Sequence, residues 1–583
     1  MRKTKIICTI GPASDNKETL TRLIENGMNA ARLNFSHGNH EEHGKRIELI
    51  KNLRKDIKKP IAIILDTKGP EIRTGNFKEG KVELLEGQDY TITTRSVDGD
   101  NTICAVNYAD LHEDVKPGDT ILIDDGLIGL SVVSIEGQDI HCKVLNSGPV
   151  SNHKGVNVPN VKINLPAITE KDIEDIKFGI ESGIDIIAAS FVRKASDVLA
   201  IRKILEQNGG EDILIVSKIE NQEGVDNLDE IIKLSNGIMV ARGDLGVEIP
   251  VEEVPLVQKK IIEKCNRAGK FVITATQMLD SMIRNPRPTR AEASDVANAI
   301  LDGTDAIMLS GETANGKYPI DAVATMAKIA TKAESALNYD AILKRRQANQ
   351  MATVPDAISL ATVTTSAQLK ASAIITATQT GHSARIVSKY RPQSPIIAVT
   401  PYEKVARRLS IVWGVYPIIA DKMETADEVV EKSVNEALVQ GFVKKGELVV
   451  IAAGVPAGYT GTTNMLKVHI VGDILVKGTA MGNSTYGNAC VVKDTKNIND
   501  FLNDGDILVI KRLEKEYLDV LDRVSGVITE EGGLTSHAAV QCISMGIPLI
   551  TGAEGATDII RTGTLITMDA RNGFVYSGKA NVM

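Results

Sequence analysis

The chain has 583 residues, of which 43% are hydrophobic and 24% are charged, and its formal net charge is −8 at pH 7. This length corresponds to several domains of about 100–200 residues each, with enough apolar residues for buried cores. The acidic balance argues against nucleic acid or an anionic membrane as the main partner. A 3% aromatic content with a single tryptophan also argues against base-stacking surfaces. A multidomain globular enzyme is the expectation.

The cysteines and the N-terminus indicate the compartment. The six cysteines are scattered without C-x-x-C pairing, which is typical of reduced thiols in a cytoplasmic protein and not of disulfides or a zinc site. The N-terminal run MRKTKIICTIG is basic, but its apolar stretch is too short for a signal peptide. No segment approaches the roughly 18 apolar residues of a transmembrane helix. We therefore expect a cytoplasmic protein with no membrane partner.

Apolar, β-branched runs that end in polar residues recur along the first half of the chain. They are KIICTIG, AARLNFS, IAIILDT, IDIIAASF, ILIVSKIE, GIMVARGD, FVITATQ and AIMLSGET. Helical segments lie between most of them: one begins with a capping box at Thr169 and ends at Gly183, and another runs from Thr289 to about Asp302. Near-continuous apolar strands that alternate with helices predict an α/β fold with a covered parallel sheet. Eight such units fit a (β/α)8 TIM barrel of about 250 residues, whose active site lies at the C-terminal strand ends.

The pattern changes between the third and fourth of these strands, from about Lys68 to Pro166. Short alternating strands such as KVELLEG, DYTITT and DIHCKVLNSG, separated by Gly and Asp turns, replace the strand–helix units. We expect a small inserted β-barrel domain. Because it emerges from a loop on the catalytic face, it is placed to close over the site as a lid and exclude water.

A second α/β block begins after about Asn338, with strands SAIITATQ, PIIAVT, VYPIIA, ELVVIAAG and MLKVHIV. Its first strand ends in TATQTGHSAR, where hydroxyls and backbone N–H groups at a strand-to-helix turn suit a phosphate. The candidate residues are Thr378, Thr380, Gly381, His382 and Ser383. The turn has neither a Walker lysine nor a complete G-x-G-x-x-G fingerprint, and it is equally typical of a helix cap.

The runs SKIEN and MVARGDLG carry the strongest chemical signal. Each apolar strand breaks abruptly into charge, with Lys218 and Glu220 in the first run and Asp244 in the second. Magnesium takes oxygen ligands and is typically held by one or two carboxylates plus substrate oxygens. Either run alone is explained by a surface ion pair. Together, within the barrel pattern, they predict a divalent cation that shares an anionic substrate with Lys218.

A series of motifs in chain order resembles the pyruvate kinase family over residues 1 to about 472. These motifs are CTIGPAS, ARLNFSHG, DTKGPEIRT, KGVNVP, SKIEN, MVARGDLG, ATQML, NPRPTRAE and MLSGETA. The resemblance implies phosphoryl transfer from phosphoenolpyruvate to ADP in glycolysis, giving ATP and pyruvate, with Mg²⁺ or Mn²⁺ and K⁺ as cofactors. It also implies a homotetramer and a phosphorylated small-molecule effector.

The resemblance implies catalytic roles for motif residues. Arg32 would bind the substrate phosphate, and Lys218 would stabilise the transferring phosphoryl group and the developing enolate. Thr276 would belong to a relay that protonates the enolate, since a threonine is too weak an acid to be the sole donor. Ser310 and Glu312 would support that relay, although LSGET is also typical of a helix N-cap with an acidic first turn.

The resemblance implies further binding contacts. Backbone amides of Gly243 and Asp244 would hold the substrate carboxylate, and Glu220 and Asp244 would hold the divalent metal. The implied nucleotide contacts are Asn34, His37, Arg73 and Lys154, and the implied potassium ligands are Asn34, Ser36, Asp66 and Thr67. Family members activated by fructose 1,6-bisphosphate bind it at the loop matching 378–383. Because His382 stands where a fixed positive charge is expected, a sugar monophosphate or AMP remains equally compatible.

The last segment carries a second resemblance. EEGGLTSHAAVQCISMGIPLITG is similar to the swivelling phosphohistidine domain of phosphoenolpyruvate-utilising enzymes, with His537 at the carrier position. No ATP-grasp partner is recognisable, so we interpret this extension as structural or regulatory. The predicted domains are the barrel (1–67 and 167–338), the lid (68–166), the effector-binding α/β domain (339–472) and the extension (473–583).

Two other function classes are compatible with parts of the sequence. A pyruvate phosphate dikinase shares the barrel, the substrate and the swivelling segment, but the complete SKIEN and MVARGDLG set and the missing ATP-grasp region argue against it. A non-enzymatic sensor on an inactive kinase scaffold is disfavoured because every catalytic position is intact.

Overall fold

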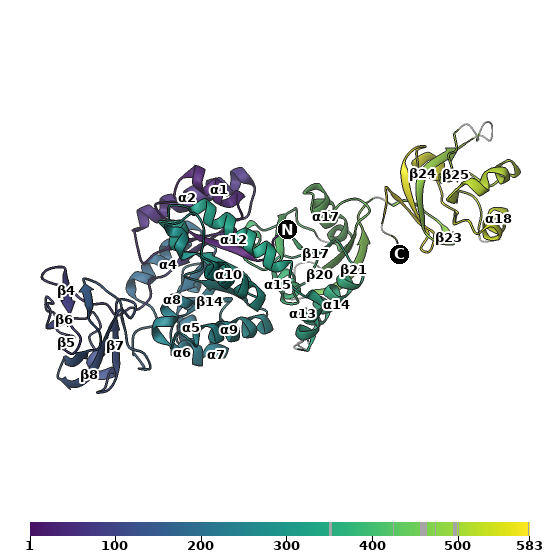
Figure 1. Cartoon of the computed structure of the whole chain (residues 1–583). Helices are drawn as coiled ribbons and strands as arrows, with labels where there is room; N and C mark the ends of the chain where they lie inside the picture. The colour runs from purple at the N-terminus through teal and green to yellow at the C-terminus, as the bar shows by residue number, and fades with distance from the viewer. Residues whose placement is uncertain are drawn as a thin grey trace. The chain divides into compact units, whose positions relative to one another are not determined.

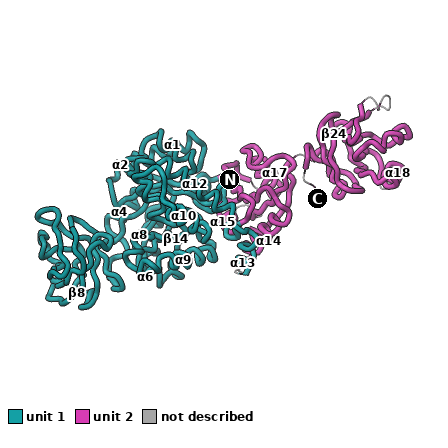
Figure 2. The backbone as a smooth tube through the Cα atoms, viewed as in Figure 1, with its two compact units in different colours: residues 1–349, 388–391, 402–417 teal, residues 350–387, 392–401, 418–583 magenta. Residues whose placement is uncertain are grey.

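The computed structural model describes residues 1–348, 353–423, 425–454, 463–472, 474–493, 498, 501–533, 535–580 and 582. Contacts divide the chain into two compact units, coloured separately in Figure 2. The first comprises Met1–Asn349, Ser388–Arg391 and Tyr402–Pro417, and the second comprises Gln350–Val387, Pro392–Pro401 and Ile418–Met583. Residues 473 and 583, the predicted bounds of the extension, lie outside the described residues.

Eight parallel strands close into a barrel in the first unit, in the order β1-β16-β15-β14-β13-β12-β3-β2. Their bounds are β1 Lys5–Thr9, β2 Ala30–Asn34, β3 Ala62–Asp66, β12 Ile186–Ala189, β13 Leu214–Ile219, β14 Gly237–Ala241, β15 Phe271–Ala275 and β16 Ala306–Leu309. These strands fall in the eight apolar runs of the sequence, so the predicted TIM barrel is confirmed.

Helices surround the barrel strands (Figure 1). They are α1 Lys17–Glu25, α2 His40–Ile57, α4 Glu170–Ser182, α5 Ala195–Gln207, α6 Gln222–Asp226, α7 Leu228–Leu234, α8 Arg242–Glu248, α9 Val254–Ala268, η1 Asp280–Ile283, α10 Arg290–Asp302, α11 Gly311–Ala314 and α12 Pro319–Glu334. The next helix in the chain is α13 Tyr339–Gln347. The predicted capping boxes at Thr169 and Thr289 are both formed, and Gly183 ends α4 with a left-handed φ of 69°.

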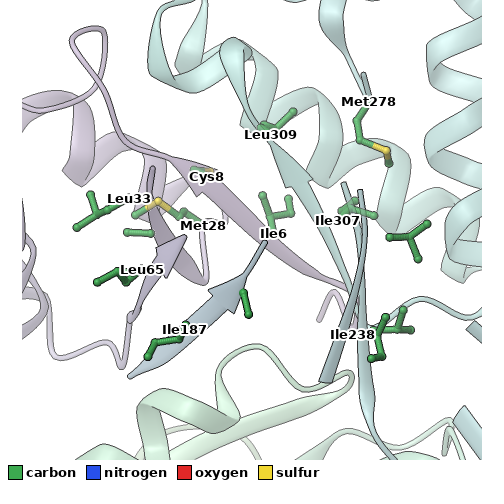
Figure 3. Packing of buried hydrophobic residues seen from close by; sticks show 14 of the residues in the cluster. Ile6, Cys8, Met28, Leu33, Leu65, Ile187, Ile238, Met278, Ile307 and Leu309 are labelled. Atoms are coloured by element: carbon green, nitrogen blue, oxygen red, sulfur yellow. The ribbon is translucent and has the colours of Figure 1, made fainter. Parts of the chain in front are cut away.

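Side chains of the barrel strands alternate between two apolar layers. In β1, Ile6 and Cys8 pack in the outer layer against the helices, whereas Ile7 faces the barrel interior. Figure 3 shows labelled members of this outer layer, among them Ile187, Ile238 and Leu309 on three separate strands. Because both faces of each strand are buried, the sequence of each strand is continuously apolar instead of alternating.

The segment 402–417 packs against the N-terminal ends of the barrel strands. Ile411 joins the interior apolar layer, and Arg407 Nε lies 2.8 Å from Asp185 Oδ1, just before β12. Lys5 Nζ at the start of β1 donates a hydrogen bond to the Val415 carbonyl over 2.5 Å. This segment therefore belongs to the barrel unit, although the sequence pattern places it inside the second α/β block.

The inserted β-domain lies between β3 and β12. It contains β4 Lys81–Leu84, β5 Asp89–Thr93, β6 Ile103–Ala105, α3 Leu111–Asp114, β7 Thr120–Ile123, β8 Ile128–Glu136, β9 Asp139–Val144, β10 Gly148–Ser151 and β11 Val156–Asn157. The strands are hydrogen-bonded as a six-stranded sheet, β11-β7-β8-β9-β5-β6, and a two-stranded sheet, β10-β4. Leu84 and Val150 of the smaller sheet share one apolar core with the larger sheet. This domain thus consists of two sheets around one core, and its hydrogen bonds do not close one ring.

The second unit contains two sheets of its own. The first has the order β19-β18-β17-β20-β21 and the second the order β22-β29-β28-β24-β25-β26-β27-β23. The α/β block with the first sheet contains α14 Val354–Gln368, β17 Ala373–Ala377, α15 His382–Lys389, β18 Ile396–Thr400, α16 Glu403–Leu409, β19 Val415–Ile419, α17 Ala426–Val439, β20 Leu448–Gly454 and β21 Thr463–Ile470. Of these, α16, the end of α15 and the start of β19 fall in the segments that belong to the barrel unit. The elements of the extension are β22 Ile474–Lys477, β23 Thr479–Met481, β24 Thr485–Val492, β25 Ile507–Ile510, η3 Lys515–Arg523, β26 Gly526–Thr529, α18 His537–Met545, β27 Leu549–Thr551, α19 Ala556–Ile559, β28 Leu565–Asp569 and β29 Phe574–Ser577. In the described part of the chain, no helix is long and apolar enough to span a bilayer.

Candidate active site

Lys218 lies at the centre of a charged cluster at the C-terminal ends of the barrel strands. Its Nζ is 3.1 Å from Asp66 Oδ1 and 2.9 Å from Glu220 Oε1, and the residue is only 8% exposed. Burial lowers the pKa of Lys218, but Asp66 and Glu220 more than offset this, so its pKa is raised and the ammonium stays charged. Burial also raises the pKa of Glu220, to about 7, against the opposing effect of Lys218.

Arg32 and Lys218 share the carboxylate of Asp66. Arg32 Nε donates to Asp66 Oδ2 over 2.6 Å, and its Nη1 donates to Thr9 Oγ1 over 3.0 Å. Burial opposes ionisation of Asp66, but Arg32 and Lys218 prevail and lower its pKa. Asp66 thus holds two cations in fixed positions, and Glu220 pairs with Lys218 as a second carboxylate.

The turn Ser190–Phe191 at the end of β12 holds this cluster in place. Ser190 Oγ lies 2.8 Å from Lys218 Nζ, and the Phe191 N–H donates to Glu220 Oε2 over 2.5 Å. Phe191 has a φ of 55°, a backbone conformation that aromatic residues rarely adopt. Neither residue is among the site residues that the sequence predicts. The one available signal was the position of Ser190 at the polar end of a barrel strand.

Thr276 and Gly243 connect the end of β15 to the start of α8. Thr276 Oγ1 accepts a hydrogen bond from the Gly243 N–H over 2.7 Å and donates to the Ala275 carbonyl over 2.6 Å. Arg242 Nη2 donates to the Thr276 carbonyl over 2.8 Å, and its Nη1 pairs with Asp295. Thr276 has a φ of 67°, a strained conformation that costs about 1–3 kcal/mol, so surrounding contacts must hold it.

Glu312 organises the loops after β15 and β16. Its carboxylate accepts hydrogen bonds from the Ser310 N–H over 2.7 Å and the Leu279 N–H over 3.0 Å. Burial raises the pKa of Glu312, while these backbone donors lower it less strongly. Within the described residues, neither Ser310 nor Glu312 hydrogen bonds with Thr276. These contacts match the cap-like interpretation of LSGET more closely than a direct relay.

Asn34 and Asp66 lie side by side at the ends of β2 and β3, where they are paired in the strand register. Asn34 Oδ1 accepts a hydrogen bond from the Ser36 N–H over 3.2 Å, and Thr67 Oγ1 accepts one from the Ser190 N–H over 3.1 Å. The fold thus gathers the four oxygen-bearing residues of the predicted potassium set onto two adjacent strand ends.

The remaining predicted nucleotide contacts come from two regions. His37 is exposed on the loop after β2, and its carbonyl accepts a hydrogen bond from His43 Nε2 over 2.8 Å. Arg73 and Lys154 belong to the inserted domain, where Arg73 lies 2.7 Å from Glu71 and Lys154 lies 2.9 Å from Asp124. Both cations are therefore paired with carboxylates of the inserted domain.

A cavity of about 450 Å³ lies between the inserted domain and the barrel. Asp125 of the inserted domain and Asp244 and Glu248 of the barrel line it. Burial and the charge of Asp244 raise the pKa of Asp125, and burial raises the pKa of Glu248. Asn157 Nδ2 donates to Glu248 Oε1 over 2.6 Å, which ties the inserted domain to α8.

Two predicted phosphate-related positions lie in the second unit. Gly381, with a φ of 80°, donates its N–H to Thr378 Oγ1 over 2.9 Å, and Ser383 and Thr463 hydroxyls lie 2.6 Å apart. Thr380 is exposed, and burial lowers the pKa of His382, which begins α15. His537 is exposed at the start of α18, directly after the N-cap Ser536.

Three family models match consecutive parts of the chain. The model described as pyruvate kinase, barrel domain matches residues 1–323, and that described as pyruvate kinase, alpha/beta domain matches residues 356–469. The third, described as PEP-utilising enzyme, mobile domain, matches residues 502–573.

Individual relatives carry the same family name. Pyruvate kinases from Sporosarcina psychrophila and Bacillus licheniformis are 53% and 54% identical to this chain over the full length of both proteins. A pyruvate kinase from Clostridium acetobutylicum is 64% identical over 472 residues, which is 81% of this chain and all of that protein. A crystal structure of a pyruvate kinase from Cryptosporidium parvum has a TM-score of 0.78 at 44% identity, covering 81% of this chain and 96% of that one. The chain therefore belongs to the pyruvate kinase family and is a phosphotransferase.

Proposed function

We propose that the protein transfers the phosphoryl group of phosphoenolpyruvate to ADP, giving ATP and an enolate that is then protonated to pyruvate. The observation that carries this proposal is the buried ammonium of Lys218, held between Asp66 and Glu220 and beside Arg32. Phosphoryl transfer is mostly a matter of positioning and charge neutralisation. Buried cations that are already in place at the C-terminal ends of the barrel strands supply both the positioning and the neutralising charge.

Glu220 and Asp244 have the donor chemistry that a divalent cation needs. Both offer carboxylate oxygens, which Mg²⁺ and Mn²⁺ prefer. No group of three or more His, Cys, Asp or Glu side chains suited to a metal occurs within the described residues. A metal held by two carboxylates would therefore depend on substrate oxygens to complete its ligands. When bound, it would neutralise charge on the transferring phosphoryl group.

Asn34, Ser36, Asp66 and Thr67 suit K⁺. All four residues offer oxygen donors, and only Asp66 is charged, which matches a monovalent ion better than a divalent one. Their position on two adjacent strand ends next to Arg32 would put such an ion beside the substrate phosphate. We assign these residues as the potassium site.

Arg32 and Lys218 act on the reacting groups. The planar guanidinium of Arg32 is fixed by Asp66 and Thr9, so it can meet phosphate oxygens without further ordering. Lys218, kept charged by its two carboxylates, stabilises the enolate oxygen as negative charge develops there.

The carboxylate and methylene end of the substrate binds at Gly243, Asp244 and Thr276. The backbone amides of Gly243 and Asp244 bind the substrate carboxylate. Because the Gly243 N–H donates to Thr276 Oγ1, carboxylate binding would replace that hydrogen bond and release the hydroxyl toward the substrate methylene. Thr276 then orders a water-mediated proton relay, to which Ser310 and Glu312 contribute by fixing the neighbouring loops.

ADP binds between the barrel and the inserted domain, in contact with Asn34, His37, Arg73 and Lys154. Nucleotide phosphates compete with Glu71 and Asp124 for the two lid cations, so binding rearranges both ion pairs. The inserted domain, residues 68–166, acts as a lid over the site.

We further propose a compartment, an oligomeric state, an effector site and a role for the extension. The protein acts in the cytoplasm as a homotetramer, and a phosphorylated small molecule regulates it through Thr378, Thr380, Gly381, His382 and Ser383 in the domain 339–472. The extension is structural or regulatory, and His537 is not a phosphoryl carrier. A relative of 472 residues that matches 81% of this chain supports the view that the core acts without the extension.

A lactate dehydrogenase-coupled assay with metal omission tests the proposed reaction. We expect pyruvate formation to require Mg²⁺ or Mn²⁺ and to be stimulated by K⁺. Full activity in excess chelator would contradict the roles of Glu220 and Asp244. Potassium independence would refute only the monovalent site. The substitution Lys218→Met should lower turnover by at least about 10²–10³-fold, the scale for losing one preorganised electrostatic group.

A further inference from the structure

Ser190 contacts both Lys218 and the strand end at Asp66 and Thr67, which lie far apart in the sequence. Its side chain is buried, with 6% of the residue exposed. Ser190 Oγ lies 2.8 Å from Lys218 Nζ, 2.7 Å from the Thr67 carbonyl and 3.3 Å from Asp66 Oδ1. A hydroxyl carries one proton, so Ser190 accepts from the ammonium of Lys218 and donates to the nearer acceptor, the Thr67 carbonyl.

The backbone of the same turn extends this arrangement to Glu220. The Ser190 N–H donates to Thr67 Oγ1 over 3.1 Å, and the next N–H, of Phe191, donates to Glu220 Oε2 over 2.5 Å. Glu220 Oε1 in turn lies 2.9 Å from Lys218 Nζ. One two-residue turn thus holds both ends of the Lys218–Glu220 ion pair.

Close packing fixes this turn against the loop after β3. A Cβ atom at Gly69 would lie 2.8 Å from Ser190 Cβ and 2.9 Å from the Phe191 ring, and Gly69 has a φ of 73°. Only glycine satisfies both requirements at this position. The turn, with a φ of 55° at Phe191, therefore packs against a position that has no room for a side chain.

We propose that Ser190 is a positioning residue for phosphoryl transfer, whose hydroxyl fixes Lys218 and links it to the Asp66–Thr67 strand end. This inference rests on the proposed function, because it takes Lys218 as the catalytic cation and Asp66 and Thr67 as potassium ligands. Among the residues that the structure describes, the other partners of the Lys218 ammonium are the carboxylates of Asp66 and Glu220. The Ser190 oxygen supplies a third, neutral acceptor that determines where the ammonium points.

The test compares Ser190→Ala with Ser217→Ala. Ser217 is a matched control because it is fully buried on β13, directly before Lys218, where successive side chains of a strand point to opposite faces. Its hydroxyl lies 2.7 Å from Ser235 Oγ. Ser190→Ala should lower kcat by about 10–100-fold, the usual effect of removing a group that orients a site residue. The KM for phosphoenolpyruvate should change by less than about threefold, since Arg32 is untouched, and Ser217→Ala should keep the wild-type kcat.

A double-mutant cycle separates positioning from general packing. If Ser190 acts through Lys218, then Ser190→Ala should lower activity far less in a Lys218→Met background than in the wild type. An equal fold-loss in both backgrounds would overturn the proposal, as would a wild-type kcat for Ser190→Ala.

Thermal unfolding gives a second readout that does not depend on turnover. KCl should raise the unfolding midpoint of the wild type and of Ser217→Ala more than tetramethylammonium chloride does, and Ser190→Ala should show a smaller difference. An unchanged potassium effect in Ser190→Ala would overturn the link to Asp66 and Thr67. If the wild type and Ser217→Ala form no pyruvate, the proposed function fails instead, independently of Ser190.

Discussion

Asp66 is the residue on which the charged contacts of the site converge. It is 1% exposed and accepts from Arg32 and Lys218 at once, and Ser190 Oγ lies 3.3 Å from its Oδ1. A buried carboxylate with two cationic partners stays ionised, and each partner is restrained by the same group. A change at any one of these residues should therefore disturb the others.

Thr276→Ala should separate the two chemical steps. The variant removes the hydroxyl that accepts from the Gly243 N–H but leaves Lys218 and Arg32 intact. We expect enolate protonation to slow more than phosphoryl transfer, because only the proton relay loses a member. Exchange of pyruvate methyl protons with D₂O, followed by NMR, measures the first step, and the coupled assay measures the second. Wild-type exchange in this variant would refute the relay role.

At the scale of elements, β1 and the segment 402–417 meet around a buried lysine. Lys5 is 2% exposed, donates to the Val415 carbonyl and lies 4.5 Å from the centre of the Tyr416 ring. Burial is the main cause that lowers the pKa of Lys5 from 10.5 to about 7, with a smaller contribution from Arg2. The charged form is thus disfavoured in the folded chain.

The pH dependence of stability follows from this shift. Below about pH 7 Lys5 is charged in both the folded and the unfolded chain, so its cost to folding is fully present. Between about pH 7 and 10.5 the unfolded chain binds more protons at this site, so stability rises with pH. Lys5→Met should flatten this rise in the unfolding midpoint, followed by fluorescence of the buried Trp413. Lys260→Met, at an exposed position, controls for the lost charge. Parallel wild-type and Lys5→Met curves would contradict the assignment.

Arg193 anchors the second connection between the inserted domain and the barrel. It donates to the carbonyls of Ile163, Leu165 and Pro166 over 2.9, 2.5 and 3.2 Å. Lysine has a single ammonium and lacks the planar guanidinium of arginine, so Arg193→Lys should lose at least one of these three hydrogen bonds. A hydrogen bond to a charged donor contributes about 1.5–3 kcal/mol, so local opening should increase by about tenfold or more.

Limited trypsin cleavage after the exposed Lys162 measures that opening. Arg202→Lys is the matched control, because Arg202 also donates to loop carbonyls, those of Glu211 and Ile213, but away from the inserted domain. Equal cleavage rates in the two variants would show that Arg193 does not anchor this connection.

Local sequence signals predicted the elements better than the contacts between them. The eight strands, the caps at Thr169 and Thr289 and the inserted domain were predictable because strand ends and caps have local residue preferences. The turn at Phe191 was not predictable, since its left-handed φ runs against the preference of an aromatic residue and its close packing against Gly69 leaves no local sequence pattern. The docking of 402–417 on the barrel ends depends on contacts such as Arg407–Asp185, which leave no periodic pattern.

At the scale of the whole molecule, every proposed catalytic residue precedes the extension. Truncation after Val471 should therefore leave a folded enzyme with wild-type chemistry, although heat stability or the effector response can change. His537→Ala in the full chain should be nearly silent in steady-state turnover, since ADP reaches the barrel site directly. Rapid-quench trapping with labelled phosphoenolpyruvate checks this. An acid-labile, base-stable phosphoprotein formed at a competent rate would contradict the non-carrier assignment.

The coupled assay on the purified full chain with phosphoenolpyruvate, ADP, Mg²⁺ and K⁺ decides whether the protein catalyses the proposed reaction. Pyruvate and ATP should form in equal amounts, with no requirement for AMP or inorganic phosphate in either direction, and Lys218→Met should reduce the rate by at least about 10²-fold. A reaction that requires AMP with phosphate or pyrophosphate would point to dikinase chemistry instead. The absence of pyruvate from a folded, metal-supplied protein would contradict the account.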